Sequence, residues 1–384
     1  MNLNATKPFH SIDEVSDLRG ACVVVRASLN VPLVDGVVRD NFRIKEACKT
    51  ILYLKEKGAR VIVLAHIGRK QTETLKPVYD SMQQFMSIIW AGGLLGEKVT
   101  DAVSPLSDGE VILLENVRSD PREVANDDAF ARALAAYGDI YVNDAFADSH
   151  REHASIVGIP TYLPSYAGFL FAREYKKFSQ VFDPVHPALF VLGGAKFETK
   201  LPLVERFVQK YDHVFIGGAI ANDFLKGKGD EVGVSTVSDI DLSSSALLND
   251  PKILLPSDVV VLGPNGRRNT IAEDVAADES ILDVGPKTLE DLAPVISAAT
   301  TILWNGPLGN YEKGFDAGTN VLAKMIADAD GTSIIGGGDT IAAIEALGLN
   351  DKFDFISTAG GAMLEFLEKE TLPGIEALRT SRRE

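Results

Sequence analysis

Cysteine is scarce in this sequence, since the 384 residues include only Cys22 and Cys48. Two cysteines in apolar stretches make neither a disulfide framework nor a metal-ligand pattern, so we interpret both as reduced core residues. Uninterrupted apolar runs of membrane-spanning length are also lacking, and the polar start, residues 1–10, differs from a secretory signal. We therefore expect a cytoplasmic protein with no membrane partner.

Positive charge is in short supply as well. Lysine and arginine number 38 against 54 aspartates and glutamates, which gives a net charge of −16. Nucleic-acid binding depends on basic surface, so we expect no nucleic-acid partner. Of the six histidines, only His150 and His153 have a metal-like spacing. We reject a zinc site there because a third ligand is missing and Arg151 between them would repel a cation.

The residues that are abundant indicate a two-domain α/β protein. Apolar residues make up 46% of the chain, and the length suits two cores better than one. Short β-branched runs alternate with amphipathic stretches, a pattern typical of parallel sheets covered by helices on both faces. The predicted strands are Val23–Val25, Val61–Leu64, Val111–Leu114, Ile140–Val142, Leu189–Leu192, Val214–Ile216, Val259–Leu262, Thr301–Trp304, Ser333–Ile335 and Phe353–Ile356.

We predict two doubly wound, Rossmann-like domains joined by a hinge helix. The segment Leu163–Phe182 lacks a strand pattern and is interpreted as a helix between the halves, with a proline-bounded break at 184–187. The predicted boundaries are 1–165 for the first domain, 166–183 for the hinge helix and 184–369 for the second domain. In such sheets ligands bind beyond the carboxyl ends of the strands, so the residues that follow each strand are the ones to inspect.

Strand ends in the first half carry arginines. Guanidinium groups bind phosphate and carboxylate in a two-pronged geometry, and each charged hydrogen bond contributes about 1.5–3 kcal/mol. One such residue could form an ordinary surface ion pair, but several at one sheet edge favour an acidic ligand. The arginines at these positions or at the start of the first helix are Arg26, Arg43, Arg69, Arg118 and Arg151.

Strand ends in the second half carry glycines instead. Glycine lets main-chain amides approach a ligand closely, and a following helix N-terminus favours phosphate. The chain contains neither the G-x-x-x-x-G-K-[ST] loop nor a G-x-G-x-x-G fingerprint after its first strand, which disfavours Walker-type NTPases and dinucleotide-dependent dehydrogenases. We expect the ligand loops to include Gly194, Ala195, Gly218, Gly337 and Gly338.

Eleven short segments occur in a fixed order along the chain: 26–32 (RASLNVP), 42–44 (FRI), 66–69 (HIGR), 114–118 (LENVR), 142–146 (VNDAF), 150–153 (HREH), 193–196 (GGAK), 283–288 (DVGPKT), 304–307 (WNGP), 336–340 (GGGDT) and 372–374 (LPG). No single segment is specific, but the ordered set is. In this order, the segments resemble those of the phosphoglycerate kinase family over essentially the whole chain.

The resemblance implies reversible phosphoryl transfer between ATP and 3-phosphoglycerate in glycolysis and gluconeogenesis. It places 3-phosphoglycerate on the first domain, with the C-terminal segment 370–384 packed back on that domain, and it implies a monomer. Arg43, Lys196 and Lys200 are the expected catalytic residues. The expected contacts of 3-phosphoglycerate are Ser28, Asn30, Arg43, His66, Arg69, Arg118 and Arg151.

The same resemblance places Mg²⁺ with ATP or ADP on the second domain. Asp339 is the expected metal-associated carboxylate, and Glu312 is expected to hold the ribose. Closure about the hinge is expected to bring the two ligands together. Besides the glycine loops named above, the nucleotide contacts implied are Lys196, Lys200, Asn305, Pro307, Glu312, Asp339 and Thr340.

Some positions depart from the family pattern. Ser28 stands where the family has an aspartate, Ser119 and Asp120 stand where an aromatic residue and a histidine are usual, Lys70 replaces a proline and Ala359 replaces a glycine. These departures leave open the alternative of a degenerate kinase that serves as a nucleotide-binding scaffold. Arg43, Lys196, Lys200 and Asp339 are all retained, which favours the enzyme.

Overall fold

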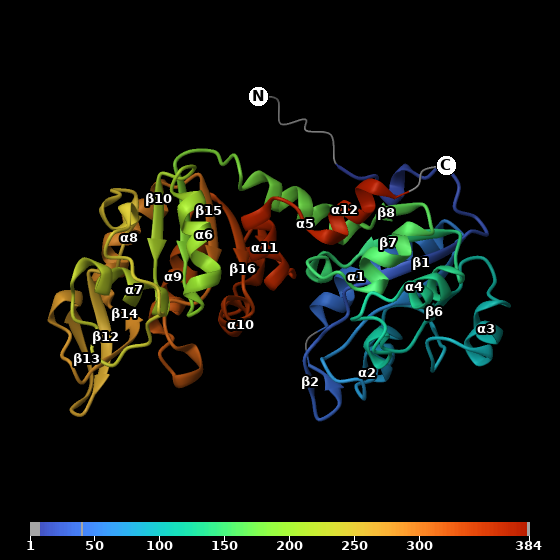
Figure 1. The fold of residues 1–384 in the computed structure, drawn as a ribbon, viewed down its shortest axis with the longest axis horizontal. Coiled ribbons are helices and arrows are strands. Elements are labelled where there is room, and N and C mark those ends of the chain that lie inside the picture. The colour runs from blue at the N-terminus through green and yellow to red at the C-terminus, as the bar shows by residue number, and fades with distance from the viewer. Residues whose placement is uncertain (1–7, 40, 382–384) are drawn as a thin grey trace. The chain divides into compact units, whose positions relative to one another are not determined.

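The computed structural model describes residues 8–39 and 41–381. Contacts within the chain divide it into two compact units, residues 1–176 with 369–384 and residues 177–368. The predicted first-domain ranges and the polar start include residues 1–7, 40 and 382–384, which lie outside the described part. Figure 1 shows both units as ribbons, and each is treated separately below.

A six-stranded parallel sheet forms the centre of the first unit, with strand order β5-β6-β4-β1-β7-β8. Its central strands are almost fully buried and rich in valine and isoleucine, as expected for a sheet covered on both faces. The strands are β1 (Cys22–Ala27), β4 (Arg60–Leu64), β5 (Ile89–Trp90), β6 (Val111–Leu113), β7 (Ile140–Asp144) and β8 (Ser165–Ala167), with a small hairpin of β2 (Leu33–Val34) and β3 (Val37–Val38).

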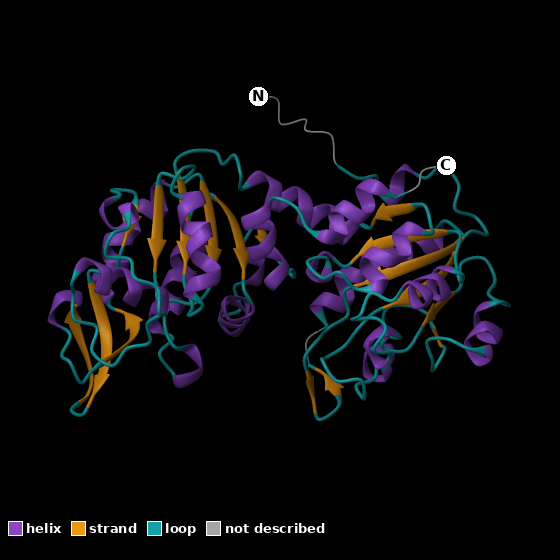
Figure 2. Ribbon diagram, in the orientation of Figure 1, coloured by secondary structure: helices purple, strands orange, loops and turns teal. Residues whose placement is uncertain are grey.

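Helices flank this sheet, as Figure 2 shows. Helix α1 buries an apolar stripe that includes Ile44, Ala47, Ile51 and Leu54, and Gly58 adopts a left-handed φ of +78° just after the helix ends. The helices of this unit are α1 (Phe42–Glu56), α2 (Lys76–Met82), α3 (Glu97–Val103), α4 (Asp128–Ala135) and α12 (Pro373–Thr380), and α5 (Phe169–Gln180) starts in it. Helix α12 contacts β8.

The second unit is built on another six-stranded parallel sheet, in the order β11-β10-β9-β15-β16-β17. Numbered along the chain this order is 3-2-1-4-5-6, the doubly wound arrangement in which a ligand crevice opens between the first and fourth strands. The strands are β9 (Ala188–Leu192), β10 (His213–Ile216), β11 (Ile253–Leu254), β15 (Thr301–Asn305), β16 (Thr332–Gly336) and β17 (Phe355–Ile356).

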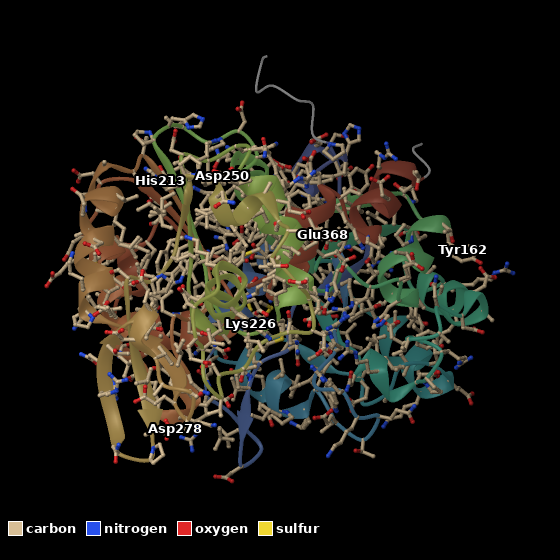
Figure 3. The ribbon with its side chains drawn as sticks, turned by 60° about the vertical axis from the view of Figure 1, so that its left-hand side comes forward. Tyr162, His213, Lys226, Asp250, Asp278 and Glu368 are labelled. Carbon is tan, nitrogen blue, oxygen red and sulfur yellow. The ribbon has the colours of Figure 1, made fainter. Side chains whose placement is uncertain are left out.

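Helices also flank the second sheet, and an antiparallel sheet of order β13-β12-β14 is added to it. Charged side chains such as Lys226 and Asp278 are exposed on this unit (Figure 3). The helices are α6 (Phe197–Phe207), α7 (Gly218–Lys228), α8 (Pro286–Ala298), α9 (Ala317–Ala327), α10 (Gly338–Ala346) and α11 (Gly361–Lys369), and the added strands are β12 (Asp258–Gly263), β13 (Gly266–Ile271) and β14 (Ser280–Val284).

The predicted fold class is confirmed, and two details of the prediction are wrong. The run Val259–Leu262 lies in the antiparallel sheet as part of β12, paired with β13 and β14, because an apolar run does not reveal the direction of its neighbours. The segment Leu163–Phe182 does contain a strand, the three-residue β8, which pairs with β7 at the sheet edge. Helix α5 within that segment covers Phe169–Gln180.

No helix in the described ranges combines the length and the apolar character that crossing a membrane requires.

Candidate functional site

In the first unit, buried polar side chains gather where β1, β4 and β7 end. Arg26 is only 1% exposed, and its guanidinium is surrounded by internal partners. Its Nε donates to Ser155 Oγ at 2.9 Å and its Nη1 donates to the Ala27 carbonyl at 2.7 Å. Arg26 Nη2 lies 3.1 Å from His66 Nδ1 and 3.2 Å from Asp148 Oδ2. Arg26 therefore binds other residues of the site and does not face a ligand. Its position at a strand end predicts a ligand-facing arginine, so this part of the prediction is wrong.

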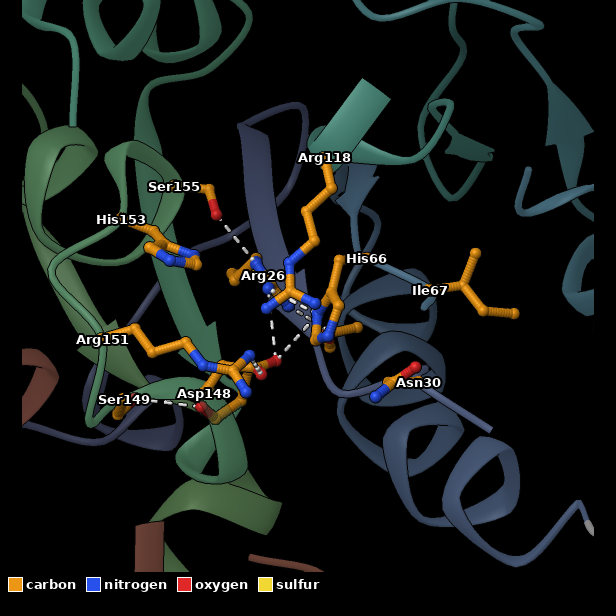
Figure 4. Close-up of polar contacts among 12 residues, drawn as sticks. Arg26, Asn30, His66, Ile67, Arg118, Asp148, Ser149, Arg151, His153 and Ser155 are labelled. Carbon is orange, nitrogen blue, oxygen red and sulfur yellow. Dashed lines mark hydrogen bonds and ion pairs between the residues drawn. The ribbon is translucent and has the colours of Figure 1, made fainter. Parts of the chain in front are cut away.

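Asp148 is the carboxylate at the centre of this cluster (Figure 4). Its Oδ2 also lies 3.2 Å from His66 Nδ1, and its Oδ1 accepts from Arg151 Nη1 at 3.1 Å. Burial alone would raise the pKa of Asp148, but the positive charges of its neighbours outweigh burial and hold this pKa well below its usual range. Asp148 is thus ionised, and burial lowers the pKa of His66.

Arg118 and Arg151 point into the same space as Asp148 and His66 in Figure 4. Arg118 donates to the Gly68 carbonyl, and its main-chain amide donates to Asn116 Oδ1 at 3.1 Å. Burial and the nearby charge of Arg151 lower the pKa of Arg118. Two guanidinium groups that repel each other at a partly buried position form a favourable environment for an anion.

Two histidine side chains, those of His153 and His66, also face this site. Burial, Arg118 and Arg151 lower the pKa of His153 to about 4, so His153 is neutral near pH 7. The Nε2 atom of His66 is buried and has no hydrogen-bond partner among the described residues. A buried, unpaired imidazole nitrogen beside two arginines is available to a ligand atom.

The other residues predicted for this site lie on neighbouring segments. Asn30 Oδ1 accepts from the Gly68 amide at 2.9 Å, which fixes the loop after β4. Ser28 is buried just after β1, Arg43 is partly exposed as the second residue of α1, and Arg69 is exposed. The contacts described above do not join Ser28, Arg43 or Arg69 to the cluster around Asp148.

In the second unit the loops after β9 and β15 lie against each other at the centre of the sheet. The Gly193 amide donates to the Asn305 carbonyl and the Gly194 amide to the Pro307 carbonyl, both at 2.9 Å. Gly218 has a φ of +62°, and a Cβ on it would lie 2.5 Å from the Gly194 nitrogen. Glycine is therefore required at Gly218 for these loops to approach so closely.

Several predicted nucleotide residues line one cavity of about 310 Å³ beside these loops. The lining includes mainly apolar side chains together with a few polar ones, a composition typical of small-molecule sites. The predicted residues found on the cavity wall are Gly194, Ala195, Gly218, Pro307, Glu312 and Asp339.

Lys200 is buried in α6 and donates through Nζ to the Gly193 carbonyl. Burial lowers the pKa of Lys200 to about 8, while Asp339 acts in the opposite direction. Lys196 is exposed at the residue before α6. Two lysines and an aspartate near a glycine-rich loop have the charges that phosphates with a divalent cation require.

The remaining predicted residues hold the loops around the cavity. Thr340 Oγ1 accepts from the Gly306 amide at 3.0 Å, while Asn305 is buried at the end of β15. Gly337 precedes α10 with a φ of +100°, and Gly338 is its first residue. Groups of three or more His, Cys, Asp or Glu side chains able to hold a metal are absent from the described residues, so a cation at Asp339 would need ligand phosphates.

Sequence reasoning missed several residues at both sites. Asp283 lines the second-unit cavity, accepts from the amides of Val284 and Gly318 at 2.9 Å, and has a pKa that burial raises to about 6. In the first unit, sequence reasoning missed Asp148 and also Glu123, whose Oε1 accepts from Ser155 Oγ at 2.6 Å. Asp148 follows β7 by four residues and is identifiable by that placement, whereas Glu123 lies in an irregular segment that carries no sequence signal.

Comparisons with known proteins agree with these observations. The family model described as "Phosphoglycerate kinase" matches residues 12–370. The phosphoglycerate kinase of Sphingopyxis alaskensis is 42% identical over 394 residues, covering 97% of this chain and 99% of that protein. That of Agrobacterium fabrum is 41% identical over 398 residues, with the same coverage. The solved phosphoglycerate kinase structure from Coxiella burnetii matches with a TM-score of 0.84 and 35% identity, covering 97% of this chain and 98% of that one.

Proposed function

The chain belongs to the phosphoglycerate kinase family, and from this membership we propose how its own residues carry out the reaction. The enzyme transfers a phosphoryl group reversibly between ATP and the carboxylate of 3-phosphoglycerate, giving ADP and 1,3-bisphosphoglycerate. Such a transfer needs in-line placement of the two ligands and compensation of the charge on the transferring oxygens, with little covalent participation by the protein.

The acidic substrate is assigned to the first unit. The observation that supports this assignment is the pair of guanidinium groups, Arg118 and Arg151, beside the unpaired Nε2 atom of His66. These groups would hold the phosphate and carboxylate of 3-phosphoglycerate. Ser28, Asn30, Arg43 and Arg69 on adjacent segments complete the proposed contacts.

The nucleotide is assigned to the second unit. The cavity beside the β9 and β15 loops would hold the nucleoside, with Glu312 at the ribose, and the glycine loops with Lys196, Lys200 and Thr340 would face the phosphates. Asp339 would hold Mg²⁺ together with phosphate oxygens, and the cation would compensate phosphate charge. The fit of this site to a magnesium nucleotide rests on the exposed carboxylate of Asp339 beside the buried amine of Lys200.

Arg43 and Lys196 are proposed to stabilise the transferring phosphoryl group, with Lys200 fixing the loop beside it. We further propose residues 1–165 with 370–384 as the substrate domain, 166–183 as the hinge and 184–369 as the nucleotide domain. Hinge motion would accompany transfer, because productive phosphoryl transfer needs the two ligands in line. A monomer in the cytoplasm stays a prediction from the sequence.

Calorimetric titration with each ligand separately tests the site assignments. 3-Phosphoglycerate should bind the wild type and should bind Arg118→Ala far more weakly, while MgADP binds both equally. Arg132→Ala is a matched control, because Arg132 has a side chain that is 70% exposed and pairs with Asp128 away from the cluster. Equal 3-phosphoglycerate affinity in the wild type and Arg118→Ala would contradict the assignment.

A further inference from the structure

Asp148 occupies the position that an anionic ligand would take among the cations of the first-unit site. Its carboxylate contacts Arg26, His66 and Arg151 at 3.1–3.2 Å and is almost fully buried. Arg26 is equally buried, and its guanidinium also donates to Ser155 and to the Ala27 carbonyl. The side chain of Arg151 is 34% exposed and has only one of its nitrogen atoms on Asp148, so Arg151 can exchange partners.

Charge balance explains why a carboxylate is needed there. Arg26, Arg118 and Arg151 are close enough for their charges to act on the same histidine, His153. The carboxylates that act on Arg118 are Asp148 and Glu123, and burial raises the pKa of Glu123 above its usual value. The pKa of Asp148 is low, so Asp148 stays ionised and supplies negative charge to the cluster when no ligand is bound.

We propose that Asp148 is an internal counter-ion that competes with small anions for Arg151 and thereby sets the preference of the site for a ligand with two anionic groups. The proposal rests on the assignment of this site to 3-phosphoglycerate. A single phosphate must take Arg151 away from Asp148 and remain next to that carboxylate. A ligand with both phosphate and carboxylate engages more cations at once, which offsets the loss of the Arg151 contact.

The variant Asp148→Asn tests this proposal, because it keeps the size of the side chain and removes its charge. Titration calorimetry would give the dissociation constants of inorganic phosphate and 3-phosphoglycerate for the wild type and the variant. We expect phosphate to bind the variant about five- to tenfold more tightly, as removal of one partly screened charge predicts. 3-Phosphoglycerate should gain less, so its preference over phosphate should fall.

Asp80→Asn is the matched control. It also removes one acidic charge from the same unit, but Asp80 is exposed and pairs with Lys76 on α2. Both dissociation constants should stay at wild-type values in this control. Unchanged or weaker phosphate binding by Asp148→Asn, or an unchanged preference between the two ligands, would overturn the proposal. Failure of the wild type to bind 3-phosphoglycerate would instead contradict the site assignment itself.

Removal of Asp148 leaves the buried Arg26 without its counter-ion, so the variant could be unstable. Asp148→Ser, whose hydroxyl can still accept from Arg26, is therefore measured in parallel. Thermal unfolding with and without phosphate gives a second readout. Phosphate should stabilise either variant more than the wild type, because it replaces the missing negative charge. Equal or smaller stabilisation, or a failure of phosphate to restore folding to both variants, would count against the proposal.

Discussion

The side-chain amine of Lys200 donates to the main-chain carbonyl of Gly193, so a buried cation in α6 holds the loop that follows β9. Gly193 in turn donates to Asn305 at the end of β15. One amine therefore stabilises the junction of the two loops that flank the second-unit cavity. The amine lies within electrostatic reach of Asp339 and Lys196.

The titration of Lys200 predicts a pH dependence of stability. Burial lowers the pKa of Lys200 from its ordinary value of 10.5 to about 8 in the folded protein. Between these two values the unfolded chain binds more protons, so wild-type stability should rise with pH relative to Lys200→Met, with a slope of at most about 1.4 kcal/mol per pH unit. Urea unfolding of both proteins at pH 7.5, 8.5 and 9.5 measures the difference, and a difference independent of pH would refute this titration.

The titration of Asp144 predicts a pH dependence of stability with the opposite sign. Its Oδ1 accepts from the amides of Leu170 at 2.9 Å and Phe171 at 3.2 Å at the start of α5. Burial raises its pKa from 3.8 to about 7, so between these values the folded protein binds more protons than the unfolded chain. Wild-type stability should therefore fall as pH rises from about 4 to about 7, relative to Asp144→Asn. Denaturant unfolding of both proteins across that range checks the sign, and a difference that does not fall as pH rises would show that Asp144 is already ionised in the folded protein.

Arg118→Ala should mainly raise the KM for 3-phosphoglycerate, because a contact made equally in the ground and transition states affects binding. Loss of a charged hydrogen bond of about 1.5–3 kcal/mol corresponds to an increase of about ten- to a hundredfold. Steady-state kinetics with varied 3-phosphoglycerate and saturating MgATP provides the measurement. A large fall in kcat with an unchanged KM would reassign Arg118 to the chemical step.

Arg43→Ala and Lys196→Ala should mainly lower kcat, since both residues are proposed to act on the transferring phosphoryl group. The expected loss is about 3–4 kcal/mol in each, by analogy with removal of an oxyanion donor. Arg43→Lys should restore little activity, because lysine lacks the planar fork of arginine. The same kinetic assay decides the matter. Near-normal kcat with a raised KM in Arg43→Ala would show that Arg43 only binds substrate.

Strand positions were predictable because buried parallel strands are continuous apolar runs, as β1 and β9 are. The antiparallel direction of β12 was not predictable, because strand pairing depends on residues distant in the chain. Strand β8 was not predicted, because three residues, one of them a serine, are too few to show a strand pattern.

The sequence predicts which residues lie near the strand ends but not the contacts that their side chains make. Strand ends identified Arg118 and Arg151 correctly as neighbours, and they also identified Arg26, which the structure surrounds with internal partners. A sequence shows which residue follows a strand but not whether its side chain turns toward solvent or back under the sheet. The pairing of Asp148 with two arginines and a histidine from different segments is a tertiary contact that no local pattern encodes.

The most direct test of the account is a coupled assay of the purified protein with 3-phosphoglycerate and MgATP, run also in reverse with 1,3-bisphosphoglycerate and MgADP. The account predicts turnover in both directions, with dependence on Mg²⁺ and on both substrates. Protein that binds MgADP but shows no turnover in either direction would contradict it and would leave a nucleotide-binding scaffold as the explanation of the fold.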